Sequence, residues 1–213
     1  MPYLQCQHFR ETERPPYGWA AQSSAQTDAG DALVDPQTGL STLRDFYRRG
    51  QPLVDGCLSR KTPCAVAIID IDHFRRLNET YCEETAGRVL RAIAAKLDAA
   101  CCGKGHLPTR LGIEAFGLLL IGLDEAGAMD FCERLRLDIA AMRFEAGDSD
   151  FSVTVSIGLA KICGPETFDN YLNAAEQFLF MAKSHGRNQV FSERKVVLHA
   201  AERPLSSDHD AGA

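Results

Sequence analysis

The feature that most constrains the fold is an apolar run that ends in two acidic residues. Cys64–Ile69 are six consecutive apolar residues, followed directly by Asp70, Ile71 and Asp72. Such a run predicts a central strand that is buried on both faces. Because side chains alternate along a strand, Asp70 and Asp72 lie on the same side of its end. Their charges repel unless a cation or hydrogen-bond donors lie between them, so the pair indicates a divalent-metal site.

Asp72 has a simpler alternative role. Helical spacing of apolar residues begins at His73, and an aspartate directly before a helix commonly accepts hydrogen bonds from its first N–H groups. We therefore expect Asp72 to cap this helix, whether or not Asp70 binds a metal.

A second constraint is a predicted hairpin. Thr109–Leu111 predicts the start of one strand and Phe116–Leu123 a second, buried strand. Residues 112–115 between them leave room only for a tight turn. Glu114 lies close to Gly112, where the backbone can approach a ligand, and this combination suits a phosphate-and-metal site. Taken alone, a solvated glutamate in an ordinary turn is the favoured alternative.

The remaining elements are predicted from hydrophobic periodicity. Helices are expected after a Ser41 cap, over His73–Tyr81, over about 86–97, over Asp124–Met142, and over Phe168–Lys183 with Gly186 at its C-terminal end. Strands are expected over Phe151–Ala160, with one buried face, and at the edge over Val190-Phe191. This order predicts an α/β (α+β) layer structure with helices packed on a largely antiparallel sheet.

Composition excludes several classes of function. The net charge of -6 and the pI of about 5.5, without a basic run, argue against nonspecific nucleic-acid binding. No stretch approaches the ~20 consecutive apolar residues that a membrane helix needs. Met1–Arg14 lacks the apolar core of a secretory signal. A cytoplasmic location is therefore expected by default.

The eight cysteines do not indicate a disulfide framework or a zinc site. They contain no Cys-x-x-Cys pair and have no histidine nearby at ligand spacing. Several, such as Cys64 and Cys132, lie in apolar context, where cysteine behaves as a small buried hydrophobe. We expect them to be reduced and mostly structural.

Three segments are expected along the chain. Residues 1–33 are rich in polar and small residues without sustained periodicity, which is typical of a flexible leader. Residues 34–192 carry all the predicted elements and form one domain. Residues 193–213 are a polar tail.

The sequence resembles the GGDEF family, the diguanylate cyclase domain, from about Asp35 to Phe191. Five blocks carry the resemblance in the family's order: Asp35–Leu40, Asp70–Glu79, Arg110–Phe116, Thr154–Ala160 and Ala182–Asn188. The resemblance implies the palm-like fold shared by nucleotide cyclases and polymerases. In active relatives, two domains meet face to face with one GTP each and make cyclic di-GMP.

The resemblance also implies a set of site residues. It places the family's metal positions at Asp70, Ile71 and Glu114, and a Mg²⁺ ion would bind there only together with nucleotide. It places nucleotide contacts at Asn78, Gly112, Lys183 and Arg187. In relatives, the asparagine contacts guanine, and the lysine and arginine contact phosphate. Each cation alone is more often a solvated charge near a helix end.

Several family positions are altered. The signature Gly-Gly-(Asp/Glu)-Glu-Phe is here Gly112-Ile113-Glu114-Ala115-Phe116, so that a methyl group replaces the glutamate that serves metal binding and catalysis. Ile113 replaces the second glycine, and Gly87 replaces an aspartate on the guanine edge. The Arg-x-x-Asp motif of the product-inhibition site corresponds to Gly103 and His106, which cannot grip a cyclic di-GMP dimer in that way.

Three functions remain open at this point. The first is a degenerate GGDEF domain without catalytic activity, which acts on a protein partner of a signalling pathway and binds GTP weakly. The second is an active or slow diguanylate cyclase. The third is a GTP-responsive regulatory module. A homodimer is expected only through the family's face-to-face arrangement, and the sequence does not identify the protein partner.

Overall fold

The computed structural model describes residues 32–147 and 149–194. The predicted leader and tail lie almost entirely outside these residues, so their boundaries at 33/34 and 192/193 stay predictions. Among the described residues, no helix is both long enough and apolar enough to cross a membrane.

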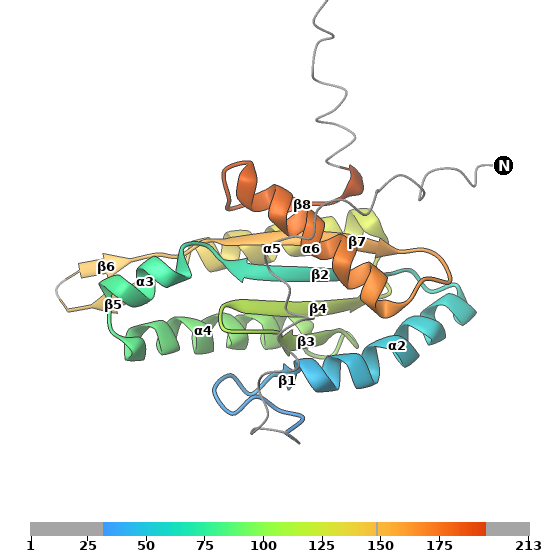
Figure 1. Cartoon of the computed structure of the whole chain (residues 1–213), viewed down its shortest axis with the longest axis horizontal. Helices are drawn as coiled ribbons and strands as arrows, with labels where there is room; N and C mark the ends of the chain where they lie inside the picture. The colour runs from blue at the N-terminus through green and yellow to red at the C-terminus, as the bar shows by residue number, and fades with distance from the viewer. Residues whose placement is uncertain (1–31, 148, 195–213) are drawn as a thin grey trace, which may run out of the picture. The chain divides into compact units, whose positions relative to one another are not determined.

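The core of the fold is a six-stranded sheet with strand order β1-β3-β4-β2-β7-β8 (Figure 1). The three inner pairings are antiparallel, and the two outer pairings, β1 with β3 and β7 with β8, are parallel. The prediction of a largely antiparallel sheet is therefore confirmed. The strands are β1 Ser41–Thr42, β2 Cys64–Ile71, β3 Leu107–Arg110, β4 Ala115–Ile121, β7 Val155–Ile162 and β8 Val190–Phe191.

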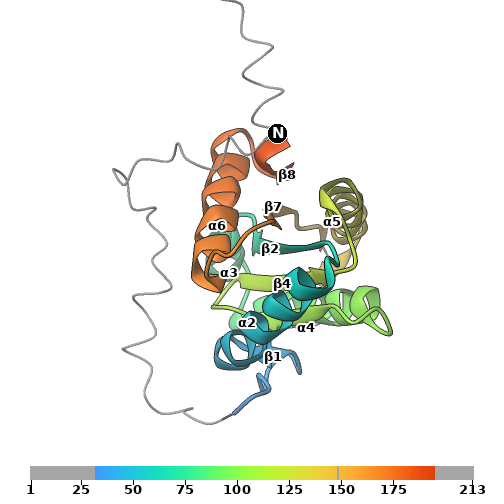
Figure 2. The ribbon, with the colours of Figure 1, turned by 90° about the vertical axis from the view of Figure 1, so that its right-hand side faces the viewer.

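The described residues form five helices around this sheet. They are α2 Leu43–Arg60, α3 Phe74–Thr80, α4 Glu83–Cys101, α5 Glu125–Ala140 and α6 Phe168–Ser184. The main core lies between the sheet and α4 and α5, and it contains alternate residues of β2, from Ala65 to Ile71. The other face of the sheet packs against α6, which lies opposite α5 in Figure 2.

The β2 strand behaves as its sequence predicts, because all eight of its residues are buried. It pairs with β4 on one side and with β7 on the other, which leaves no edge exposed. The even-numbered residues of β2, including Asp70, point to the face that α6 covers. The fold therefore brings an acidic side chain under the C-terminal part of a helix.

The position of α6 depends on a glycine in β7. A Cβ atom built on Gly158 would lie 2.0 Å from the Ala175 carbonyl oxygen and 2.2 Å from the Leu179 nitrogen. Only a glycine lets the backbone of the helix approach the strand this closely. At its far end, α6 terminates as predicted: Gly186 has a φ of 108°, and the Arg187 N–H donates to the Ala182 carbonyl.

The predicted strand over Phe151–Ala160 is wrong as a single element. Phe151 ends β6 (Ser149–Phe151), which pairs with β5 (Phe144–Ala146) in a separate two-stranded sheet, and β7 begins only at Val155. The Phe151 ring stacks on Tyr81 with 4.4 Å between centroids, and it stacks on Phe144 as well. These aromatic contacts draw the segment away from the main sheet.

Two details at the start of α2 also differ from the prediction. Thr42, and not Ser41, caps the helix, and its hydroxyl accepts from the Asp45 N–H. Ser41 belongs to β1 instead, where it lies opposite Thr109. Gly50 and Pro52 both lie inside α2, and Gly50 gives the Phe168 ring of α6 room to pack against the helix.

Candidate functional site

The β3–β4 hairpin brings the signature segment beside the end of β2. In the β2–β4 ladder, Ala115 lies directly opposite Asp70, and in the β2–β7 ladder Ser156 lies opposite Asp70 on the other side. Directly opposed residues of antiparallel strands have their side chains on the same face, with Cβ atoms about 4.5–5.5 Å apart. The methyl group of Ala115 is therefore the immediate neighbour of the Asp70 carboxylate.

A lysine from α6 meets this carboxylate. Lys183 Nζ lies 2.7 Å from Asp70 Oδ1, and the side chains are only 12% and 6% exposed. Burial raises the pKa of Asp70 to about 6, although the Lys183 ammonium lowers it and the carboxylates of Glu114 and Asp72 raise it further. The Lys183 ammonium therefore balances the negative charge that Asp70 carries at the end of β2.

Glu114 lies at the hairpin turn and is half-buried. Its carbonyl oxygen accepts from the Ile71 N–H, which extends the pairing of the hairpin with β2 by one residue. Burial raises the pKa of Glu114, while Lys183 and Arg110 lower it. Glu114, Asp70 and Lys183 therefore form one electrostatic group.

The buried side chain of Arg110 stabilises the β3–β4 hairpin. Its guanidinium donates to the Ile113 carbonyl oxygen and lies 4.7 Å from the centre of the Phe116 ring. Burial lowers its pKa to about 10, against the opposing influence of the Asp35 and Glu114 carboxylates. The turn that carries Glu114 is consequently fixed by a charged group, and Ile113 at its tip is 77% exposed.

The expectation that Asp72 caps the following helix is wrong. His73 occupies the N-cap position of α3 in a left-handed conformation, without a side-chain capping bond. Asp72 accepts instead from the Thr154 and Ser156 hydroxyls, at 2.7 and 2.6 Å. The hydroxyl residues lie far along the chain, so a local capping rule could not find them.

The other predicted site residues lie on the surface around this group. Asn78 is exposed on α3, the short helix that follows β2, and Gly112 is exposed in the hairpin. Arg187 is exposed in the turn after α6, where its φ is 63°. Ile71 has a buried apolar side chain, so only its carbonyl oxygen could serve a metal.

The region around Gly87 holds two side chains that the sequence did not single out. A Cβ atom built on Gly87 would lie 3.3 Å from Arg91 Nη1 and 3.6 Å from Gln37 Nε2. Hydrogen-bond donors thus stand where relatives carry a carboxylate on the guanine edge. No local pattern connects Gln37, in the turn before β1, with a residue of α4.

The magnesium site that the resemblance implies has few protein ligands. Among residues 32–147 and 149–194, no three His, Cys, Asp or Glu side chains gather in a way that could hold a metal. Asp70, the Ile71 carbonyl and Glu114 could hold one ion, with nucleotide phosphates as further ligands. The side chain of Ala115 offers no oxygen as a further ligand.

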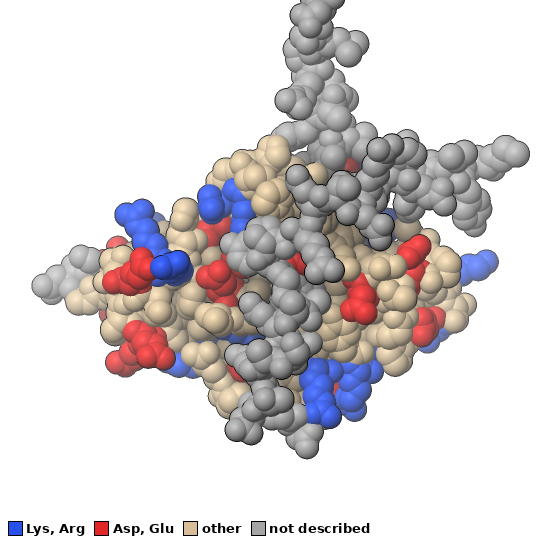
Figure 3. Space-filling view, in the orientation of Figure 1, with Lys and Arg blue, Asp and Glu red and all other residues tan. Residues whose placement is uncertain are grey.

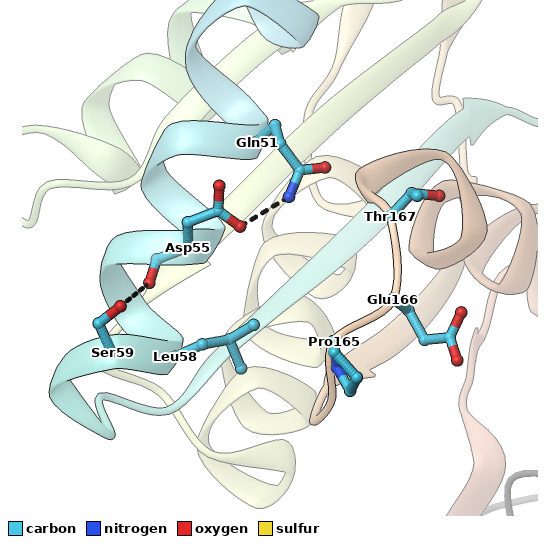
Figure 4. Close-up of a pocket in the computed structure, with 7 residues that line it drawn as sticks. All are labelled: Gln51, Asp55, Leu58, Ser59, Pro165, Glu166 and Thr167. Atoms are coloured by element: carbon cyan, nitrogen blue, oxygen red, sulfur yellow. Dashed lines mark hydrogen bonds between the residues drawn. The ribbon is translucent and has the colours of Figure 1, made fainter.

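A pocket of about 370 Å³ lies away from this group. It lies between α2 and the loop before α6 and is lined by residues that include Asp55, Leu58 and Glu166 (Figure 4). It is at the Cys64 end of β2, the end remote from Asp70, because Cys64 pairs with Ile162 just before that loop. It therefore belongs to a different part of the surface.

The positions of the product-inhibition motif are used structurally. His106 Nδ1 accepts from the Ile121 N–H at 3.1 Å, and its ring packs edge-on against Phe131. Gly103 adopts a φ of 71° in the loop after α4. Neither residue supplies a charged group for a bound nucleotide.

Comparisons with known proteins agree on one family. The family model described as "Diguanylate cyclase, GGDEF domain" matches residues 32–189. The response regulator PleD of Caulobacter vibrioides is 32% identical over 166 residues, which are 75% of this chain and 36% of that protein. The diguanylate cyclase DgcM of Escherichia coli is 34% identical over 158 residues, 74% of this chain and 38% of that protein. The chain thus spans little more than a third of these relatives' length.

Solved structures show the same fold. The diguanylate cyclase SiaD of Pseudomonas aeruginosa, in complex with its activator SiaC, has a TM-score of 0.71 at 27% identity, covering 81% of this chain and 65% of that one. The GGDEF domain of DgcB from Caulobacter crescentus, in complex with c-di-GMP, has a TM-score of 0.73 at 24% identity, covering 76% and 96%. The predicted mixed α/β fold is confirmed.

Proposed function

The chain belongs to the GGDEF family of diguanylate cyclase domains, and on that premise we propose that it serves cyclic di-GMP signalling without making cyclic di-GMP. It acts through contact with a protein partner and binds GTP weakly at the site around Asp70. The degenerate signature, with Ala115 in it, is the reason for this assignment.

The observation that carries the proposal is the position of Ala115 opposite Asp70. Cyclisation needs a 3′-hydroxyl to attack the α-phosphorus of a second GTP and to expel pyrophosphate. Two divalent ions held by carboxylates stabilise the attacking oxygen and the leaving group in such reactions. At Ala115, a methyl group takes the place of one of those carboxylates, and we therefore expect the chemical step to be lost.

Weak nucleotide binding is compatible with the residues that remain. Lys183 and Arg187 supply positive charge for phosphates, Asn78 supplies an amide for the base, and the Gly112 backbone is open to a ligand. Gly87 supplies no carboxylate for the guanine edge, which lowers the expected discrimination between bases. One magnesium ion at Asp70 and Glu114 would neutralise phosphate charge when nucleotide binds.

A protein partner is supported by the surface of the hairpin. Ile113 is among the most exposed large apolar side chains of the described residues, and it stands at the tip of the turn beside the candidate site. The related structure of SiaD contains a protein activator, SiaC. On the face shown in Figure 3, acidic and basic side chains are interspersed, which does not favour nucleic acid as the partner.

A slow cyclase is the second candidate. It is favoured by the retained pair of Asp70 and Glu114, and by relatives named as diguanylate cyclases. If the chain makes cyclic di-GMP, Asp70→Ala must abolish the product, because one of its two remaining carboxylates is removed. Product that persists in Asp70→Ala comes from a contaminating enzyme.

The proposal is tested by calorimetric titration with GTP and Mg²⁺, with chromatography of the products. We expect binding in the high micromolar range or weaker and no cyclic di-GMP. An active diguanylate cyclase in the same buffer is the positive control. The double variant Lys183→Met/Arg187→Met is the negative control for GTP binding, because it lacks both cations that contact phosphate. Turnover comparable to the active enzyme would overturn the proposal.

The outcome also separates the related functions. GTP binding without turnover, accompanied by a change in affinity for the protein partner, would make the domain a GTP-responsive module. A cytoplasmic location and a face-to-face homodimer remain part of the proposal. The homodimer is checked by measuring the molar mass of the protein in solution with and without GTP.

A further inference from the structure

The turn that joins α6 to β8 has an uncommon backbone conformation. Arg187 and Asn188 have φ values of 63° and 45°, and Gly186 before them has 108°. Residues other than glycine rarely adopt this left-handed region. Two of them in succession persist only where surrounding contacts determine the conformation.

Asp72 supplies the first of these contacts. Its Oδ2 accepts from the Asn188 backbone N–H at 3.0 Å. The same carboxylate accepts from the hydroxyls of Thr154 and Ser156 and is only 6% exposed. These hydroxyls fix the carboxylate in place, so that one of its oxygens faces the turn. A buried charge with three donors is a strong anchor.

Arg136 of α5 supplies the second contact. Its Nη1 donates to Asn188 Oδ1 at 2.8 Å, while its Nε donates to Glu133 at 2.7 Å. The Arg136 side chain is only 14% exposed. Asn188 is therefore held through its backbone by Asp72, directly after β2, and through its side chain by Arg136 of α5.

A third set of contacts closes the end of α6. The Gln189 side chain donates to the carbonyl oxygens of Ala182 and His185, at 3.0 and 2.8 Å. Lys183 lies in this last turn of the helix, and Arg187 follows four residues later. The conformation of the turn thus determines where both cations are presented.

We propose that Asp72 and Arg136 are positioning residues for the phosphate-binding end of the site. Asp72 holds the left-handed turn, and the turn presents Arg187 to a polyphosphate. This inference rests on the proposed function, because that function assigns phosphate contacts to Lys183 and Arg187.

The test compares variants of the two anchors in the full chain. Asp72→Asn keeps the shape of the side chain and removes its charge. Arg136→Met removes the hydrogen bond from α5 to the Asn188 side chain. This variant tests the inference if Asp72→Asn does not fold. Asp138→Asn is the matched control, because it removes a carboxylate charge from α5 that pairs with Lys96 and is not part of either anchor. Calorimetry with GTP, inorganic triphosphate and guanosine is combined with hydrogen exchange of the 187–189 amides.

We expect Asp72→Asn to weaken binding of GTP and of inorganic triphosphate about ten-fold or more, in line with the loss of a hydrogen bond to a charged group. Arg136→Met should weaken both about three- to ten-fold. Guanosine affinity should not change in either variant. The 187–189 amides should exchange faster in both variants, and their exchange should be unchanged in Asp138→Asn.

Two results would overturn the inference. If Asp72→Asn leaves the exchange of these amides unchanged, Asp72 does not hold the turn. If exchange accelerates but triphosphate affinity stays the same, the turn does not position the phosphate site. If the unaltered protein binds neither GTP nor triphosphate, the proposed nucleotide binding fails instead. The exchange rates alone then decide whether Asp72 and Arg136 are anchors.

Discussion

At the scale of single residues, the Asp70 carboxylate is the group whose surroundings matter most. Burial disfavours its charge, Lys183 at 2.7 Å favours it, and Glu114 and Asp72 disfavour it again. Burial dominates, so the pKa of Asp70 rises from an ordinary value of 3.8 to about 6. The folded protein therefore holds this proton more tightly than the unfolded chain does.

A pH dependence of stability follows from this difference. The contribution of the Asp70 proton is fully present below about pH 4 and is lost as the pH rises through about 6. We compare the protein with the double variant Asp70→Asn/Lys183→Met, in which the pair is uncharged. The free energy of unfolding, measured in urea, should fall relative to the variant between about pH 4 and 6 and should stay level above 7. A relative rise over that range would contradict the assignment.

Cys82 gives a second prediction at this scale. It is exposed at the N-cap of α4, and its hydrogen bond with Thr85 lowers the pKa of the thiol. Because the thiolate is the reactive form, Cys82 should be alkylated faster than the exposed Cys102 near pH 7. Mass spectrometry of the labelled peptides measures both rates. Thr85→Val should slow Cys82 alone, and equal rates in the unaltered protein would refute the prediction.

At the scale of elements, the contact between α6 and β7 determines where Lys183 meets Asp70. The backbone of α6 packs directly against Gly158, in the middle of β7. Its last turn then passes over the end of β2, where the ion pair forms. If a side chain at position 158 pushed α6 away from β7, Lys183 and the turn at Arg187 would move with the helix.

We therefore expect Gly158→Ala to be costly. Its Cβ would overlap backbone atoms of Ala175 and Leu179, which a rotamer change cannot relieve. Overpacking of this kind costs about 1–3 kcal/mol or more. Gly164→Ala is the control, because its Cβ would find only the Tyr171 hydroxyl, at 3.8 Å. Urea unfolding compares the two variants, and equal stability would contradict the packing argument.

At the scale of the whole molecule, the fold could largely be predicted from the sequence. The apolar run of β2, the hairpin and the main helices have periodicities that tertiary contacts did not override. The strand over Phe151–Ala160 failed because alternation continues through residues 152–154, while Phe151 stacks on the distant Tyr81. Periodicity carries no information about such a contact.

The candidate site was predictable only in part. The resemblance identified Asp70, Glu114 and Lys183, which the fold brings into one group. The contacts of Asp72 depend on Thr154, Ser156 and Asn188, which meet only when β2, β7 and the turn after α6 assemble. Long-range hydrogen bonds of this kind cannot be read from a single sequence.

Synthesis of cyclic di-GMP depends on the carboxylate that Ala115 lacks, and a product assay shows whether the chain can still carry it out. The purified protein is incubated with GTP and Mg²⁺ beside its variants Asp70→Ala and Ala115→Glu, and cyclic di-GMP is quantified by chromatography. We expect no product from the unaltered protein above the amount found with Asp70→Ala. Ala115→Glu, which returns a carboxylate opposite Asp70, is the variant in which product could reappear. Cyclic di-GMP formed by the unaltered protein and abolished in Asp70→Ala would contradict the account.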